Sequence, residues 1–360
     1  MGGTELLRAN LLSPLVLAFA LGAVARAVRS ELRIPKELYQ ALSIYLLLAL
    51  GLKGGVELAH AGLAGIWRPA LATLLLGCIT PLTAYLALRR LGKFSTDDAA
   101  GIAAHYGSVS AVTFLAAQQF VTAVGATAEP YMATLLALLE SPGIHIALAI
   151  GVIARLRRTQ AGQAAAAEAE AVPVRAAVGG PGGFVTAVSP MADPAPVQDR
   201  PATLASTLHE VLTGRTMVLL AGGLVVGFLM GERGWTQVQP FFESGFKGAL
   251  VIFLLEMGMV AASRAGELRR VGPFLLAFGI VTPLVHGALG VWLGHLAGLS
   301  PGGATVLGAM AASASYIAAP PAVRAQLPEA NPTYSLTLAL AITFPFNVLV
   351  GIPFFYWLAS

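Results

Sequence analysis

Two short polar segments, each inside a long apolar stretch, contain the residues best suited to bind an ion. The first is AAHYGSVSAVTF at residues 103–114, and the second is AMAASASYIA at residues 309–318. A shift of 205 positions aligns Ser108 with Ser313 and Ser110 with Ser315. Gly107 among small polar residues in the first stretch, and Pro320-Pro321 just after the second, make both breakable. Unwound backbone inside a membrane is tolerated only within protein or along a cavity. The repeat therefore predicts one site formed by both halves of the chain.

Interrupted helices offer two kinds of ligand. Helix N-termini that point into the protein present N–H groups and a positive dipole end to a small anion. Unwound carbonyls and hydroxyl groups suit a sodium ion. The hydroxyl groups in question are those of Ser108, Ser110, Thr113, Ser313 and Ser315, with Tyr316 placed to close the pocket from one side. The alternative is that the small residues only allow helices to pack closely.

Two further polar residues lie deep in apolar stretches of the same chain. Glu140 precedes Pro142 in LLALLESPGIHI, and an intramembrane carboxylate indicates a functional site by default. It could ligate a cation, carry a proton or accept a bond from a neighbouring helix. Asn347 in FPFNVLV has a comparable depth, and its amide could serve the same cavity.

The composition is that of a polytopic membrane protein. Of the 360 residues, 56% are hydrophobic and only 11% are charged, and the mean hydropathy is +0.75. An ordinary soluble domain has about 25% charged residues. The single cysteine excludes a disulfide framework, and neither nucleic-acid binding nor a zinc motif is indicated. We find no nucleotide-binding loop, zinc-protease motif or serine elbow, so we expect a transporter and not an enzyme.

Ten stretches of roughly membrane length can be marked, each needing about 20 mostly apolar residues. Arg8 and the apolar run that follows resemble a secretory signal, but the run has a counterpart in the second half, so we expect it to be the first span. The spans are expected near Leu11–Val28, Leu38–Leu52, Pro69–Leu88, Ala99–Val124, Tyr131–Ala154, Thr216–Met230, Gly248–Ala262, Pro273–Leu296, Ala304–Ala325 and Tyr334–Leu358.

The two sets of five spans match each other. Thr80-Pro81-Leu82 recurs as Thr282-Pro283-Leu284, and Pro69 and Pro273 open the corresponding spans. Because five is odd, the second set must enter the membrane with opposite polarity. We therefore expect an all-α fold of ten transmembrane helices in an inverted five-plus-five repeat, with crossed, broken fourth and ninth helices.

The chain divides into three parts by composition. Residues 1–155 form the first membrane repeat and residues 214–360 the second. Between them, residues 156–213 carry an AAAAEAEA run, a glycine-rich stretch and several prolines, which indicates a flexible linker with short helices at its ends.

The basic residues favour one orientation. With ten spans, seventeen Lys and Arg residues fall on the side of the linker and five on the side of the termini. The positive-inside rule then predicts a cytoplasmic linker and external termini in a bacterial-type plasma membrane.

Several motifs resemble the SbtA-type sodium-dependent bicarbonate transporters. They are GLKGG at 51–55, GSVSAVTF at 107–114, LLESP at 138–142, LLEMGMVA at 254–261, ASASYIAAPPAVRAQLPEANP at 312–332 and TFPFN at 343–347. The resemblance covers both membrane halves and leaves out the linker. It implies a homotrimer that imports bicarbonate with sodium by alternating access, using no organic cofactor.

The resemblance also implies where the ions bind. In this family the sites lie where the fourth and ninth spans cross, which places substrate at Gly107, Ser108, Ser110, Thr113, Ser313, Ser315 and Tyr316. Sodium is expected at Ser108, Ser110, Ser313, Glu140 and Asn347. Cyanobacterial members also bind a PII-like regulatory trimer on the cytoplasmic face, although this linker shows no specific docking motif. In that branch an acidic residue follows the second serine cluster, where this chain has Tyr316.

Two alternatives to bicarbonate symport remain open at this stage. The first is a sodium- or proton-coupled transporter of another small anion, such as an organic acid, which competition in an uptake assay would reveal. The second is a membrane sensor with a regulatory cytoplasmic linker. A sensor would bind a partner without flux, and removal of residues 160–199 would abolish its function.

Overall fold

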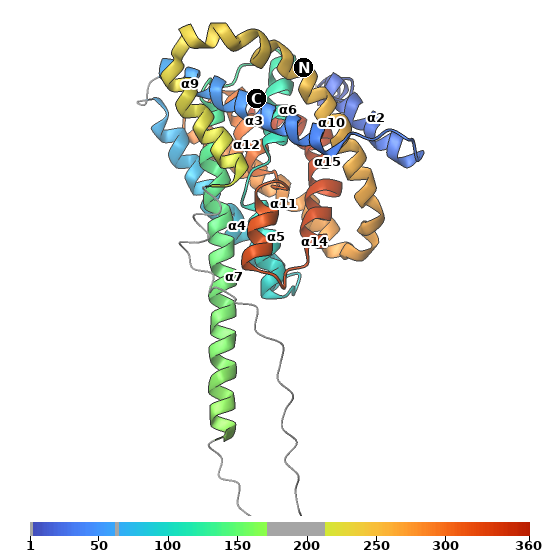
Figure 1. The fold of residues 1–360 in the computed structure, drawn as a ribbon, viewed down its shortest axis with the longest axis vertical. Coiled ribbons are helices and arrows are strands. Elements are labelled where there is room, and N and C mark those ends of the chain that lie inside the picture. Colours follow the sequence, from blue (N-terminus) through green and yellow to red (C-terminus); the bar gives the residue numbers. More distant parts are fainter. Residues whose placement is uncertain (1–2, 62–64, 171–212) are drawn as a thin grey trace, which may run out of the picture.

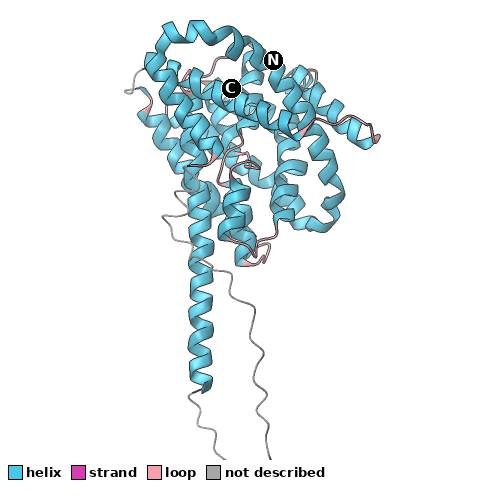
Figure 2. Ribbon diagram, in the orientation of Figure 1, coloured by secondary structure: helices cyan, strands magenta, loops and turns pink. Residues whose placement is uncertain are grey.

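The computed structural model describes residues 3–61, 65–170 and 213–360, and within these ranges every regular element is a helix (Figures 1 and 2). The first half contains α1 (Gly3–Leu11), α2 (Pro14–Ala27), α3 (Lys36–Ala61), α4 (Trp67–Arg90), α5 (Thr96–Tyr106), α6 (Ala111–Ala123) and α7 (Met132–Glu170). The second half contains α9 (Arg215–Gln239), η2 (Pro240–Ser244), α10 (Gly245–Arg264), η3 (Ala265–Glu267), α11 (Leu268–Leu296), α12 (Pro301–Ala311) and α13 (Ala319–Gln326). It ends with α14 (Pro332–Thr337), η4 (Leu338–Thr343), α15 (Phe344–Phe346), η5 (Asn347–Gly351) and α16 (Ile352–Ala359).

Seven segments of the described chain are long and apolar enough to cross a membrane. They are Lys36–His60, Trp67–Arg90, Thr96–Ala123, Met132–Arg155, Met217–Glu267, Arg270–Leu296 and Pro332–Ala359, and α2 is a shorter apolar helix. The chain is therefore an all-helical, multi-pass membrane protein. Ten spans in an inverted repeat stay a prediction.

The longest of these seven segments contains two helices that are each of membrane-spanning length, α9 and α10. At 51 residues, Met217–Glu267 would be about 75 Å long as one helix, far more than the roughly 30 Å of hydrocarbon in a bilayer. The backbone departs from helical geometry at Gly231, whose φ is 56°, and the π-helix η2 follows. The chain arches over one end of the molecule at this point, in the yellow to golden part of Figure 1, and α10 returns toward the other end.

The core surrounds the interrupted segments. Thr96–Ala123 is 94% buried over its most apolar window, a larger share than any of the other six candidates. Two clusters of buried side chains meet there, one containing Val109 and Phe114 and the other containing Ala104 and Ala314, with Tyr316 packed against both. The most polar of the long segments is thus also the most protected from lipid, as expected for helices that hold a site.

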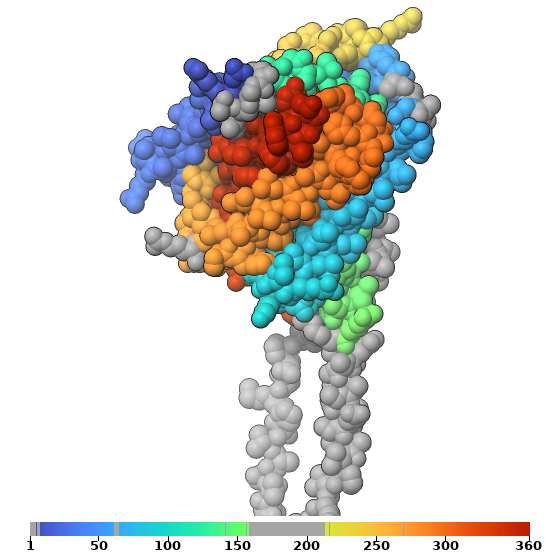
Figure 3. All heavy atoms as spheres, turned by 180° about the vertical axis from the view of Figure 1, so that it is seen from behind, coloured from blue at the N-terminus to red at the C-terminus, as the bar shows by residue number. Residues whose placement is uncertain are grey.

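The outer surface is apolar on α4 and α11. Seen from behind, these two helices form the blue and orange diagonals of Figure 3, beside the red C-terminal helix α16. Exposed leucines at helical spacing lie on α4, and exposed Ile280, Val285 and Trp292 lie on α11. An apolar face of this extent is consistent with contact with lipid chains.

Glycines allow the closest helix contacts among the remaining spans. A β-carbon at Gly51 of α3 would lie 2.8 Å from the Cα atom of Gly223 in α9, and one at Gly258 of α10 would lie 2.0 Å from the carbonyl oxygen of Phe19 in α2. Backbones this close require glycine. The Gly51 and Gly258 motifs therefore join α3 to α9 and α2 to α10.

The two ends of the described chain lie on one side. α1 packs against α16, and the buried Asn10 side chain donates to the carbonyl of Val348 at 2.7 Å. α7 projects beyond the other helices at the opposite end (Figure 1). The predicted linker, 156–213, begins inside α7, which continues as a helix to Glu170; residues 171–212 lie outside the described part of the chain.

Candidate ion-binding site between two interrupted helices

The first interruption separates α5 from α6. α5 ends at Tyr106, residues 107–110 are not helical, and α6 begins at Ala111. Ser110 has extended backbone and caps α6, since its side-chain oxygen accepts the Thr113 N–H at 3.3 Å. A serine that satisfies first-turn N–H groups is a normal helix start, and it explains why the chain re-enters a helix at this residue. The N-terminus of α6 therefore lies at the interruption.

The second interruption separates α12 from α13. α12 ends at Ala311 and α13 begins at Ala319. The Ser313 hydroxyl donates to the Met310 carbonyl at 2.7 Å, which satisfies a carbonyl at the end of α12. The Ser315 oxygen accepts the N–H groups of Ala318 and Ala319 at the start of α13. Both helices thus break where the sequence places the small polar residues.

Two hydrogen bonds join the interruptions to each other. The Ser110 N–H donates to the Ser313 hydroxyl oxygen at 2.8 Å, and the Ser315 N–H donates to the His105 carbonyl at 2.7 Å. Ser110, Ser313 and Ser315 are buried. These bonds bring residues about 200 positions apart into one local structure, the pairing expected from the serine repeat.

The first interruption lies directly against α7 and α4. A β-carbon at Gly143 would lie 1.8 Å from the Gly107 carbonyl oxygen, and one at Gly107 would lie 2.7 Å from Pro81. The Ser108 hydroxyl donates to the Glu140 backbone carbonyl at 3.0 Å. Glycine at both positions and the Ser108 bond therefore fix the interruption on the proline-containing turn of α7.

The described residues leave one carboxyl oxygen of Glu140 free to bind a ligand. Glu140 is only 3% exposed, and within the described part of the chain its Oε2 atom has no hydrogen-bond partner. A buried, unpaired carboxyl oxygen is costly unless a cation or a proton satisfies it. The same holds to a lesser degree for the Thr113 hydroxyl, which is buried and unpartnered beside Ser110.

Asn347 contacts the second interruption. It lies in the π-helix η5, and its Nδ2 donates to the Ala312 carbonyl at 2.8 Å. The Oδ1 atom of the same amide is buried and unpartnered among the described residues. π-Helical turns widen the hydrogen-bonding ladder and occur often at functional sites. Asn347 thus satisfies one carbonyl of the interruption and leaves an oxygen free for a ligand.

Tyr316 forms part of the wall at the second interruption. It is half-buried, and its ring meets Phe344 edge-on at a centroid distance of 6.0 Å. Its hydroxyl lies beside Ser110 without a well-formed hydrogen bond. The structure therefore brings Glu140 of α7 and Asn347 of η5 to the residues of the two interruptions. Glu256, the acidic residue of the LLEMGMVA motif, instead lines a pocket that contains none of them.

Sequence reasoning missed several residues that hold the site. Gly143 follows Pro142 directly, and that Pro-Gly pair in mid-span was a usable signal. The Tyr106 hydroxyl bonds to Thr343 at 2.6 Å, and the Thr343 hydroxyl bonds to the Gly279 carbonyl at 2.9 Å. Nothing in the sequence pattern links these three positions, because the contact depends on how α11 and η4 pack.

Carboxylates also tie each loop after an interrupted helix to the start of the other interrupted helix. Glu129, after α6, accepts the Ser300 N–H at the start of α12 at 2.5 Å. Asp98, in the first turn of α5, accepts the Asn331 N–H from the loop after α13 at 2.8 Å. Ser95 and Ser300 are the matching N-caps of α5 and α12. The two interrupted helices are therefore joined at both ends as well as at their centres.

Comparison with known proteins gives one family. A model of the Na+-dependent bicarbonate transporter superfamily matches residues 14–360, which is nearly the whole chain and includes both interruptions. No curated protein matches the chain.

Proposed function

The chain belongs to the Na+-dependent bicarbonate transporter superfamily, and from this membership we propose that it is a secondary transporter that imports bicarbonate together with sodium. The observation that carries the proposal is the pair of hydrogen-bonded interruptions, around which the Thr113, Glu140 and Asn347 side chains each have a buried oxygen with no partner among the described residues. Oxygens of this kind are the ligands expected for sodium at broken transporter helices.

The proposed roles divide between the two ions. Sodium binds the hydroxyl and carbonyl oxygens of Ser108, Ser110 and Ser313 together with the side chains of Glu140 and Asn347. The anion binds beside it, at the N-termini of α6 and α13, with substrate contacts from Gly107, Ser108, Ser110, Thr113, Ser313, Ser315 and Tyr316. The cation offsets the charge of Glu140 and favours the anion on the adjacent helix dipoles.

The hydrogen bonds between the interrupted helices determine which part of the protein we expect to move. The two interrupted helices share hydrogen bonds at their centres and at both ends, so we propose that they move as one unit past the α2, α3, α9 and α10 bundle in an alternating-access cycle. The proposed architecture for this mechanism is ten spans in an inverted five-plus-five repeat. Residues 1–155 and 214–360 form the two membrane units, residues 156–213 form a cytoplasmic linker, and both termini are external. A homotrimer and a cytoplasmic PII-like partner belong to the same proposal.

The test is uptake of radiolabelled bicarbonate into proteoliposomes, with and without an inward sodium gradient at equal pH on both sides. Uptake should require sodium. Ser108→Ala and Ser313→Ala should weaken the apparent affinity for both ions together, because each serine borders both sites. Folded variants that keep the normal sodium dependence of uptake would contradict the site assignment.

A second candidate substrate is supported by Tyr316. This residue stands where the cyanobacterial branch has an acid, and its phenol is at the wall of the site. A phenol hydroxyl can donate to a carboxylate, so a sodium-coupled organic-acid transporter is the alternative. In the same assay, block of sodium-dependent uptake by a small carboxylate, with no flux of bicarbonate itself, would favour it.

A further inference from the structure

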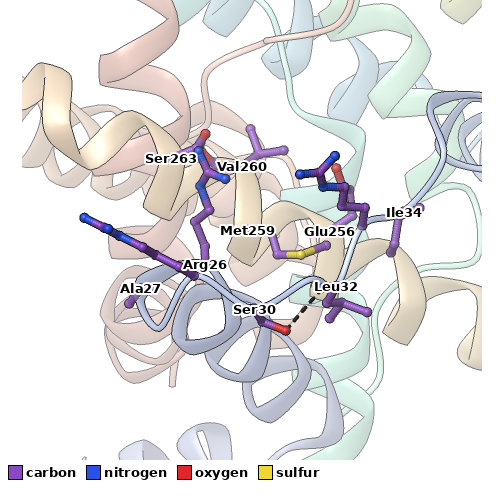
Figure 4. Close-up of a pocket in the computed structure, with 11 residues that line it drawn as sticks. Arg26, Ala27, Ser30, Leu32, Ile34, Glu256, Met259, Val260 and Ser263 are labelled. Atoms are coloured by element: carbon purple, nitrogen blue, oxygen red, sulfur yellow. Dashed lines mark hydrogen bonds between the residues drawn. The ribbon is translucent and has the colours of Figure 1, made fainter.

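A cavity of about 780 Å³ lies between the connection from α2 to α3 and one face of α10 (Figure 4). It shares no residue with the interruptions. Its lining is Arg26, Ala27, Arg29, Ser30, Leu32, Arg33 and Ile34 from the first part and Glu256, Met259, Val260 and Ser263 from the second. Arg26 extends from α2 toward α10 in Figure 4. Its volume is in the range of small-molecule pockets, which is roughly 300–1,000 Å³.

The lining is strongly basic, and its arginine side chains are available to bind a ligand. Arg26, Arg29 and Arg33 are exposed, and none of them forms an ion pair or a side-chain hydrogen bond with the described residues. Glu256 is the one acidic residue among the lining side chains, so the lining carries a net charge of two positive. Arginine binds phosphate through paired N–H donors, which makes unpaired arginines around a cavity a phosphate-binding arrangement.

An exposed apolar stripe leads along α2 to this cavity. Leu17, Leu21, Val24 and Val28 are all exposed and follow one another at spacings of four, three and four residues, which places them on one helix face. Exposed Leu32 continues the stripe into the cavity lining. The opposite face of α2 is buried and packs against α10. A ligand that fills the cavity and continues along α2 must therefore be charged at one end and apolar at the other.

We propose that this cavity binds the phosphate headgroup of an anionic phospholipid, with its acyl chains along the α2 stripe. The basic lining supplies the charge complementarity, and basic pockets beside membrane helices are sites where anionic headgroups bind. Free phosphate would use the arginines alone and would gain nothing from the stripe. A phospholipid uses both features at once.

The experiment measures thermal unfolding of the full-length protein in nanodiscs of phosphatidylcholine with increasing phosphatidylglycerol. We expect phosphatidylglycerol to raise the unfolding temperature in a saturable way. The variant Arg26→Gln/Arg29→Gln/Arg33→Gln should bind it on the order of a hundredfold more weakly, since each of the three basic residues near an anionic surface contributes about fivefold. The variant Arg26→Lys/Arg29→Lys/Arg33→Lys keeps the charges but loses paired N–H donation. Its affinity for phosphatidylglycerol should lie between those of the unmodified protein and the glutamine variant.

A matched control removes the same number of charges elsewhere. Arg90→Gln/Lys93→Gln/Arg324→Gln changes three exposed basic residues on the predicted cytoplasmic side, none of which lines the cavity. This variant should keep its response to phosphatidylglycerol. An equal loss in both glutamine variants would show general surface attraction and overturn the proposal.

Two further outcomes would also overturn it. The first is that inorganic phosphate, added to pure phosphatidylcholine nanodiscs, stabilises the protein as much as phosphatidylglycerol does, which would make this a site for a soluble anion. The second is that the cavity variant changes the oligomeric state in light scattering, which would make the cavity part of a contact between copies of the chain. Unchanged far-ultraviolet circular dichroism of the glutamine variant distinguishes lost binding from failed folding.

Discussion

At Glu140 the backbone carbonyl has a hydrogen-bond donor within the described chain, but one oxygen of the side chain does not. Its carbonyl accepts the Ser108 hydroxyl, while one oxygen of its buried carboxyl group has no partner among the described residues. Changing only the side chain therefore separates ligand binding from packing. Glu140→Gln keeps the size and the backbone contact, but it removes the negative charge that a sodium ion would neutralise.

We expect Glu140→Gln to weaken the apparent sodium affinity of uptake by tenfold to about a hundredfold, which corresponds to about 1–3 kcal/mol for a lost charged contact. Sodium titration of the uptake rate measures it. The unfolding temperature without sodium should not fall, because an unpaired buried charge is removed. Thr73→Val is the control, since its buried hydroxyl donates to the Pro69 carbonyl within α4, away from both interruptions. A normal sodium affinity in the glutamine variant would exclude this carboxylate as a ligand.

Among single residues, type and repeat predicted the serines that the two interruptions bring together, and their role as an ion site stays a prediction. Ser110, Ser313 and Ser315 could be identified because two similar polar segments in an apolar chain are conspicuous. Their local use as helix caps was not predictable, since a cap depends on where each helix restarts. Gly143 had a local signal in the Pro-Gly pair at mid-span, whereas Thr343 had none, because its bond to Tyr106 is set by the packing of distant helices.

The interruption in the first half and α7 meet backbone to backbone at Gly107 and Gly143, beside the bond from the Ser108 hydroxyl to the Glu140 carbonyl. The spacing at Gly143 leaves no room for a β-carbon, which would lie 2.3 Å from the Gly107 carbonyl carbon as well. We expect Gly143→Ala to lower the free energy of unfolding by about 3 kcal/mol, at the upper end of overpacking costs, and to abolish uptake. Thermal unfolding and the proteoliposome assay measure the two effects.

The matched control for that variant is Gly222→Ala. Gly222 lies in α9, and no atom of the described residues would lie within 4 Å of an added β-carbon, so alanine should stabilise the helix by up to about 1 kcal/mol and leave uptake intact. If Gly143→Ala behaved like Gly222→Ala, the close contact between α7 and the interruption would not be needed for transport.

Two carboxylates, Glu129 and Asp98, connect the interrupted helices at their ends. Glu129→Ala leaves the Ser300 N–H without its acceptor, and Asp98→Ala does the same for Asn331. Each should cost about 1–3 kcal/mol of stability, and the maximal uptake rate should fall more than the ion affinities because the ion ligands are untouched. Glu329→Ala, an exposed acid in the same loop as Asn331, should change neither quantity. Equal losses in affinity and in rate would argue against a role in joining the moving unit.

At the scale of elements, glycine, serine and proline predicted where helices break, but not the π-helical turns of the last segment. In η5, a side chain from elsewhere bonds carbonyls that the widened ladder leaves free. Asn10 does this for Val348 and Leu349, from a helix more than 300 positions away. A local sequence window contains no information about such a partner.

The whole molecule was predictable mainly from composition and charge. An apolar chain with few charges must be a helical membrane protein, and the fold agrees. The number of crossings is harder to derive from length alone, because α9 and α10 form one continuous apolar run and α12 and α13 are each too short to count. Orientation relies on the distribution of basic residues, seventeen against five. That distribution predicts that Ser360 lies outside and Gln160, on the projecting part of α7, lies inside.

Single cysteines test this orientation in intact cells. Cys78 is exposed on α4, so a Cys78→Ala background comes first, and Ser360→Cys and Gln160→Cys are added separately. A membrane-impermeant thiol reagent should label Ser360→Cys directly and Gln160→Cys only after permeabilisation, because loops rich in Lys and Arg stay on the cytoplasmic side. The reverse pattern would invert the molecule and place the arginine-lined cavity outside. Labelling of both sites from outside would require an even number of crossings between them, where five are proposed.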